Sequence, residues 1–104
     1  MIDKVTRVID SHCNESALKF IDMVQQERER QDKKWGEQTH SLTGWFAILG
    51  EEFGEFAKEV VELDCYRSPI ASREDTIKEL VEVAAVAQSI YEQYFVRDPN
   101  ESKT

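Results

Sequence analysis

The stretch LTGWFAILGEEFGEFAKEVVELD, residues 42–64, decides the fold of this chain. Its large apolar side chains recur at steps of three and four residues, which places them on one face of an α-helix. We therefore expect a helix from about Leu42 to Asp64, capped by Ser41 or Thr43, with its apolar face in the core. The apolar positions of this face are Leu42, Trp45, Phe46, Leu49, Phe53, Phe56, Val60 and Leu63.

A second helix is expected before this stretch, from about Glu15 to Lys34. Gly36 should stop it, because glycine readily adopts the left-handed conformation that ends many helices. The apolar residues of this helix come early, so we expect its polar second half to leave the core. Residues 1–14 form an N-terminal extension in which residues 3–10 can make a short helical turn.

A third helix is expected after the break that follows residue 64. It begins at Pro69 or, with Ser72 as its cap, at Arg73, and it ends near Phe95. Residues 96–104 are expected to be a flexible tail. Apolar side chains surround this helix almost completely, and such a helix is buried on several sides. The main apolar stripe is Leu80, Val81, Ala84, Ala87, Tyr91 and Phe95.

These three helices predict a single all-α domain over residues 1–104, folded as an antiparallel helical bundle. Glycine and proline are scarce, at four and two residues, and no segment alternates as a strand would. A chain of this length buries only a modest core on its own. We therefore expect a homo-oligomer to complete the bundle around the third helix.

Composition excludes several classes of protein. The net charge of −8 disfavours binding to nucleic acid, because phosphate backbones repel an acidic chain. No apolar run is long enough for a signal peptide or a membrane span, so no membrane partner is expected. Cys13 and Cys65 have neither CxxC nor zinc-ligand spacing, so we interpret both as ordinary thiols of a cytoplasmic protein.

Two glutamate pairs interrupt the apolar faces of the helices. At about 100° per residue, Glu52 falls inside the apolar arc of the 42–64 helix, while Glu55 and Glu59 fall at its margin. In the third helix, Glu79 falls among apolar residues and Glu82 at their edge.

A carboxylate buried without a partner is costly unless it is protonated, paired or bound to a metal ion. The two arcs carry no basic residue that could pair with these groups. Two carboxylates three residues apart share one helix face, and hard cations such as Mg²⁺ prefer oxygen ligands. The pattern therefore predicts an acidic cleft for one or more Mg²⁺ ions, although a solvated stripe of glutamates remains the alternative.

The acidic motifs resemble those of a known family. EEFGE, followed after 23 residues by ELVE, resembles the EExxE…ExxD signature of the MazG-like all-α nucleoside triphosphate pyrophosphohydrolases. The segments ERERQDKKWGEQTHS and WFAILGEEFGEFAKEV look like those of small single-domain MazG-related proteins. The resemblance covers roughly residues 18–95.

This resemblance implies an activity and a metal site. The family hydrolyses nucleoside triphosphates to the monophosphate and pyrophosphate, and it forms dimers, some of which pair into tetramers. Its four Mg²⁺ ligands correspond here to Glu52, Glu55, Glu79 and Glu82, with Mn²⁺ as a possible substitute. Glu82 departs from the usual aspartate at this position. Glu59 lies outside the motif and could serve as an outer group or as the base for the attacking water.

The resemblance also favours a nucleotide pocket around the first loop. Trp35, Gln38 and Trp45 are its candidates, because an aromatic ring can stack on a base and an amide can read its edge. Core packing is the alternative for Trp45. Lys58, Arg73 and Lys78 flank the acidic motifs and could meet the outer phosphates, or they could be exposed helix charges.

Two functions are compatible with these patterns. The first is a Mg²⁺-dependent pyrophosphohydrolase that removes surplus or non-standard (deoxy)nucleoside triphosphates. The second is a catalytically weak or inactive helical module that binds a nucleotide or another protein. Glu82 in place of aspartate is the feature that favours the second.

Overall fold

The computed structural model describes residues 15–66 and 72–96, and over these residues the chain forms helices and no strand. This confirms the all-α expectation for the described part of the chain. The predicted N-terminal turn, the alternative helix start at Pro69 and the tail beyond residue 96 lie outside it. The elements are α2 (Glu15–Trp35), α3 (Leu42–Val61), the π-helical segment η1 (Glu62–Tyr66) and α4 (Arg73–Tyr94).

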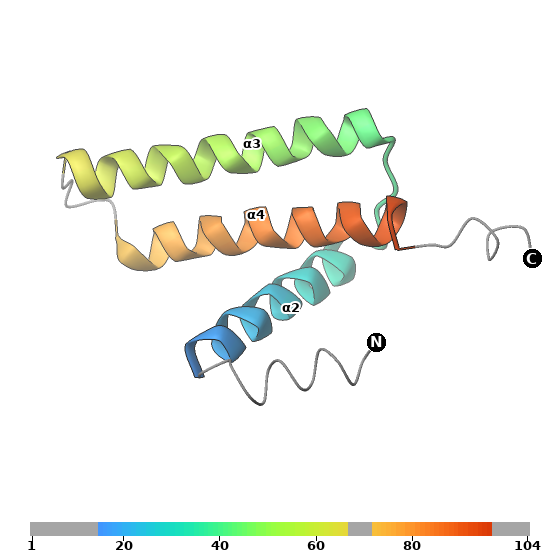
Figure 1. Cartoon of the computed structure of the whole chain (residues 1–104), viewed down its shortest axis with the longest axis horizontal. Helices are drawn as coiled ribbons and strands as arrows, with labels where there is room; N and C mark the ends of the chain where they lie inside the picture. The colour runs from blue at the N-terminus through green and yellow to red at the C-terminus, as the bar shows by residue number, and fades with distance from the viewer. Residues whose placement is uncertain (1–14, 67–71, 97–104) are drawn as a thin grey trace, which may run out of the picture.

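Two of the three long helices, α2 and α3, pack against the third, α4. In Figure 1, α3 and α4 lie side by side and run in opposite directions, while α2 crosses the other side of α4 obliquely. The helices α2 and α3 contact each other little. Because α4 touches both of its neighbours, it is the element on which side chains from α2 and α3 can converge.

The predicted caps of α3 and α4 and the predicted stop of α2 are confirmed. The hydroxyl oxygens of Ser41 and Ser72 each accept a hydrogen bond of 3.0 Å from the backbone N–H three residues later. Gly36 follows the last residue of α2 and has a φ of 75°, the left-handed conformation in which a side chain would be strained. These three residues fix where α3 and α4 begin and where α2 ends.

The helix boundaries differ from the expected ones by a few residues. The helix α2 extends to Trp35, one residue beyond the predicted end, and α4 ends at Tyr94. The largest difference is at the end of α3, where regular α-helix stops at Val61 and continues as the π-helical segment η1 to Tyr66.

The core of the single chain is small. Val24 of α2 packs against Val81 and Ala85 of α4, and partly buried apolar residues surround these three. Trp45 and Val86 are the other buried residues in the described part of the chain. The core therefore lies mainly along α4.

One sequence-based expectation about burial is wrong for the single chain. Phe46 and Phe53 of α3 are 72% and 60% exposed, because α3 packs mainly against α4 and no other described long helix covers its outer arc. The polar second half of α2 contributes no buried core residue, as expected, although it stays in contact with α4. Arg28 makes an ion pair of 2.8 Å with Glu92 of α4, which keeps this part of α2 against α4.

Candidate metal centre

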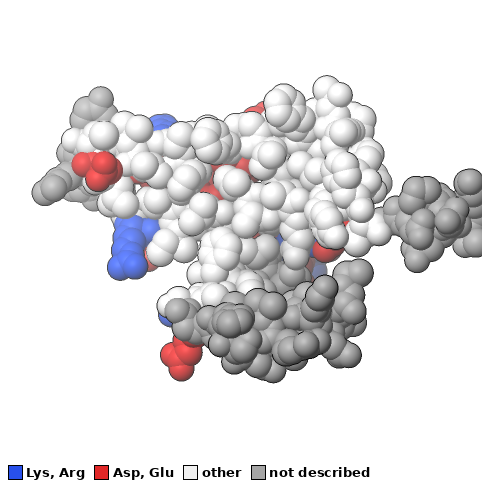
Figure 2. Space-filling model, viewed as in Figure 1, with Lys and Arg blue, Asp and Glu red and all other residues white. Residues whose placement is uncertain are grey.

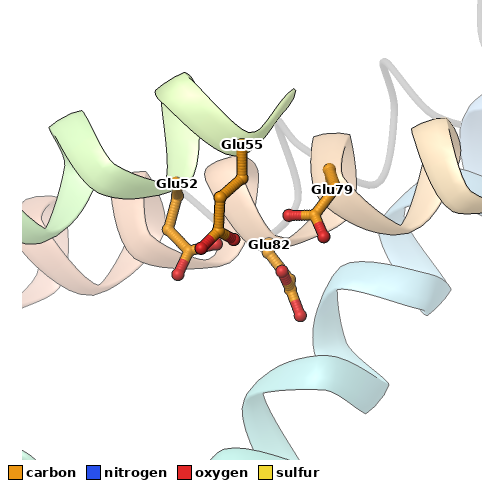
Figure 3. A group of neighbouring side chains, drawn as sticks. All are labelled: Glu52, Glu55, Glu79 and Glu82. Carbon is orange, nitrogen blue, oxygen red and sulfur yellow. The ribbon is translucent and has the colours of Figure 1, made fainter. Parts of the chain in front are cut away.

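Four glutamates converge between α3 and α4. Glu52 and Glu55 lie one turn apart on α3, and Glu79 and Glu82 lie one turn apart on the facing part of α4 (Figure 3). One carboxylate oxygen from each residue lies within 4.8 Å of the corresponding oxygens of the others. We call these four residues the acidic cluster. The antiparallel pairing of the two helices brings together side chains that are 24 to 30 positions apart in the sequence.

Two oxygens of the acidic cluster are enclosed without a hydrogen-bond donor. They are Oε2 of Glu52 and Oε2 of Glu79. Burial raises the pKa of Glu52 to about 7 and that of Glu79 to about 8, and the neighbouring Glu82 carboxylate adds to both shifts. A buried, ionised carboxylate needs a hydrogen-bond donor or a positive charge beside it, and these two oxygens accept no hydrogen bond from the described residues.

The spacing of the acidic cluster suits a hard divalent cation. Magnesium–oxygen distances of about 2.1 Å place opposite ligands about 4.2 Å apart. The observed limit of 4.8 Å is close to this diameter, so small movements of the carboxylates suffice to surround one ion. A bound cation would place a positive charge beside the carboxylates of Glu52 and Glu79, whose charged neighbours are other glutamates.

A fifth carboxylate, Glu27 of α2, lies beside the acidic cluster, and its charge raises the pKa of Glu52 further. The Glu27 side chain is only 11% exposed. Its carboxylate accepts hydrogen bonds from Arg30 Nε at 3.0 Å, from Arg30 Nη2 at 2.8 Å and from the Gln31 amide at 2.7 Å. The Arg30 hydrogen bonds are the main reason that the pKa of Glu27 is lowered.

Sequence reasoning missed Glu27 because it interpreted the polar half of α2 as solvated. The available signal was spacing. Glu27 comes three residues after the buried Val24, so both point to the same side of the helix.

The remaining charged candidates lie around the acidic cluster rather than in it. Glu59 is half-buried one turn beyond Glu55 on α3 and is not part of the group of converging oxygens. Lys58 is exposed on α3. Lys78 is exposed on α4, where its charge contributes to the lowered pKa of Glu27.

The aromatic candidates lie in different surroundings. Trp45 is buried, and its indole N–H donates to the side-chain oxygen of Gln93. The His40 ring stands edge-on to Trp45, with ring centres 4.7 Å apart. Trp35 is 54% exposed, and the Lys34 ammonium lies 4.6 Å from the centre of its ring. Trp45 therefore packs in the structure, whereas Trp35 is half-exposed with cationic side chains over its ring.

Gln38 and Trp45 line a common polar cavity of about 450 Å³. Trp35 is not among the lining residues. The cavity lies between the last turns of α2, the loop that follows, the first turn of α3 and the second half of α4. Its other lining residues are Arg28, Gln31, Asp32, Glu37, Thr39, Ser89, Glu92 and Gln93.

Comparisons of this chain with protein-family models, with curated proteins and with solved structures found no match. Among the described residues, no helix has the length and apolar character that crossing a membrane requires.

Proposed function

We propose that this chain is a Mg²⁺-dependent nucleoside triphosphate pyrophosphohydrolase, which cleaves between the α and β phosphates to give a monophosphate and pyrophosphate. The observation that carries the proposal is the acidic cluster. Four carboxylate oxygens lie within 4.8 Å of one another, and two of the four residues have enclosed oxygens without donors. The resemblance of the EEFGE and ELVE motifs to the MazG-like family points to the same site and to the same reaction.

In this proposal Glu52, Glu55, Glu79 and Glu82 hold the divalent ion, with Mn²⁺ able to replace Mg²⁺. The bound ion would neutralise phosphate charge and stabilise the in-line displacement. The carboxylates fix its position because they come from two helices that pack along their length. Glu59 is proposed as an outer group or as the base for the attacking water, since it is half-buried one turn from Glu55.

The polar cavity near Gln38 and Trp45 is the proposed place for the base and sugar. Ser89, one of its lining residues, is seven positions beyond Glu82 on α4, which corresponds to about 10 Å at the helical rise per residue. A nucleotide with its phosphates at the acidic cluster can reach across this distance. Trp35 offers an exposed ring for stacking at the nearby end of α2.

We further propose that the chain forms a homodimer, which can pair into a tetramer, and that its physiological role is removal of surplus or non-standard nucleotides. The support for association is the exposed apolar surface on α3 and α4. It includes Phe46, Phe53, Leu80, Tyr91 and Phe95.

The test is a panel of ribo- and deoxyribonucleoside triphosphates with Mg²⁺, followed by product analysis. We expect at least one of them to yield pyrophosphate and the monophosphate. Glu52→Gln and Glu79→Gln should abolish this activity, whereas Glu51→Gln, a neighbouring exposed glutamate of α3, should retain it. A panel without turnover under both Mg²⁺ and Mn²⁺ would contradict the proposal.

The alternative function is a helical module that binds a nucleotide or another protein without turnover. The observation that favours it is Glu82, whose side chain is one methylene longer than the aspartate of the family motif. Calorimetry separates the two functions. Binding of a nucleotide that requires Mg²⁺ but leads to no product supports the module, whereas product formation supports the enzyme.

A further inference from the structure

An open groove of about 870 Å³ lies between the first halves of α2 and α4. Four cationic side chains line it, Lys19 and Arg30 from α2 and Arg73 and Lys78 from α4. Among the described residues, two carboxylates, Glu27 and Glu74, line the same groove. Figure 2 shows a basic patch near the start of α4. This local excess of positive charge contrasts with the net charge of −8 of the whole chain.

The groove adjoins the acidic cluster. On α4, Lys78 immediately precedes Glu79, and Val81, which lines the groove, immediately precedes Glu82. On α2, Glu27 lines the groove and also lies close enough to Glu52 to raise its pKa. The negative charge of Glu82 likewise contributes to the raised pKa of Arg30. A ligand held by a cation in the acidic cluster can therefore extend directly into the groove.

Three positions suggest that the basic residues serve a ligand rather than the fold. Arg73 is the first residue of α4, where the helix dipole disfavours positive charge. Lys19 and Lys78 are exposed, and neither has an ion pair within 4.0 Å among the described residues. Arg30 is paired with Glu27, but half of its side chain remains exposed.

We propose that this groove binds the diphosphate end of a polyphosphate ligand. In terms of the proposed function, on which this inference rests, the groove holds the β and γ phosphates and then the pyrophosphate that leaves. The charges fit this ligand. A metal ion in the acidic cluster can neutralise the phosphate nearest to the glutamates, while the terminal phosphates need the cations that the groove supplies.

The test measures binding by calorimetry with the full chain and Mg²⁺. Three probes are compared: inorganic pyrophosphate, a nucleoside triphosphate and the matching monophosphate. The double variant Arg73→Gln/Lys78→Gln should weaken binding of pyrophosphate and triphosphate by about tenfold or more, because it removes two charged contacts. Binding of the monophosphate, which has no diphosphate end, should stay within about twofold of wild type.

A matched pair of variants on α2 provides the control. Lys19 and Lys33 are both exposed lysines of α2, but only Lys19 lines the groove. Lys19→Gln should weaken pyrophosphate binding, whereas Lys33→Gln, which removes the same charge, should not. Circular dichroism of each variant checks that the helices remain folded.

The possible failures are distinguishable. If wild type hydrolyses triphosphates but the groove variants bind pyrophosphate as wild type does, this inference is overturned and the proposed function stands. If no triphosphate is hydrolysed but pyrophosphate binding depends on Lys19, the groove stands and the proposed function fails. A loss confined to free pyrophosphate would overturn the placement of the triphosphate end.

Discussion

At the scale of single residues, the acidic cluster carries an electrostatic cost. One carboxylate oxygen of Glu52 and one of Glu79 are buried and accept no hydrogen bond, and the Glu82 carboxylate places a further negative charge beside them. A proton or a divalent cation can relieve this cost, and the two compete for the same oxygens. The stability of the protein should therefore depend on pH and on metal in a linked way.

The first prediction concerns pH without metal. The pKa values of Glu52 and Glu79 rise in the folded state from 4.5 to about 7 and about 8, so the folded chain binds protons more tightly than the unfolded chain. This contribution to stability is full below about pH 4.5 and is lost as the pH rises through 7 and 8. Thermal unfolding in a chelating buffer should show a melting temperature that falls between pH 5.5 and 8.5. A melting temperature that rises over this range would contradict the prediction.

The second prediction concerns the ligands of the ion. At pH 8, Mg²⁺ should raise the melting temperature of wild type, because an ion that binds the folded state stabilises it by mass action. Glu79→Gln should remove this increase, and without metal it should be more stable than wild type because the buried charge is gone.

Glu51→Gln is the matched control for this prediction, since Glu51 is exposed and its neighbour Glu52 belongs to the acidic cluster. The variant should retain the full response to Mg²⁺. Equal responses in Glu79→Gln and Glu51→Gln would show that the stabilising ion binds elsewhere.

At the scale of helices, local sequence signals predict the starts of α3 and α4 and the end of α2, but they do not predict which side chains are buried. Ser41, Ser72 and Gly36 act through contacts within a few residues, so their roles follow from sequence alone. The exposure of Phe53 depends on how many helices surround α3, which periodicity does not specify.

The site was predictable to the same extent. The two glutamate pairs followed from helical spacing, because each pair lies on one helix. Glu27 comes from a third helix whose angle to α4 cannot be derived from periodicity, so its place beside Glu52 required the structure.

The third prediction tests the cap of α4. Ser72→Ala removes the hydrogen bond to the first turn of the helix around which the others pack, and it should cost about 1 kcal/mol of the free energy of unfolding. Ser89→Ala is the control, because Ser89 bonds only to a carbonyl of its own helix, and its loss should be nearly neutral. Chemical denaturation of both variants measures the difference. Equal effects of the two substitutions would contradict a special role for the cap.

At the scale of the whole molecule, many large apolar side chains are exposed on the described helices and few are buried in the core. Few residues of the described chain are buried, while large apolar side chains are exposed on every long helix. Contiguous surfaces of this kind usually mark an interface. The outer arc of α3 is the clearest case, since no described element covers it.

The fourth prediction is that this arc of α3 holds two copies together. Phe46, Phe53 and Val60 recur every seven residues, with Gly50 and Ala57 between them, which is the spacing of a helix that packs against another along its length. Wild type should therefore be a dimer or a tetramer in light scattering at micromolar concentration, with a melting temperature that rises with concentration.

Phe53→Lys should shift the protein towards monomer, because it places a charge in the centre of the arc. Ala47→Lys is the matched control, since Ala47 is an exposed residue of α3 about 120° away from Phe53 around the helix. This variant should remain associated. A monomeric wild type, or dissociation caused equally by both lysines, would show that the exposed phenylalanines are not the interface. If the acidic cluster is formed within one chain, metal binding should survive in the Phe53→Lys monomer even though its stability is lower.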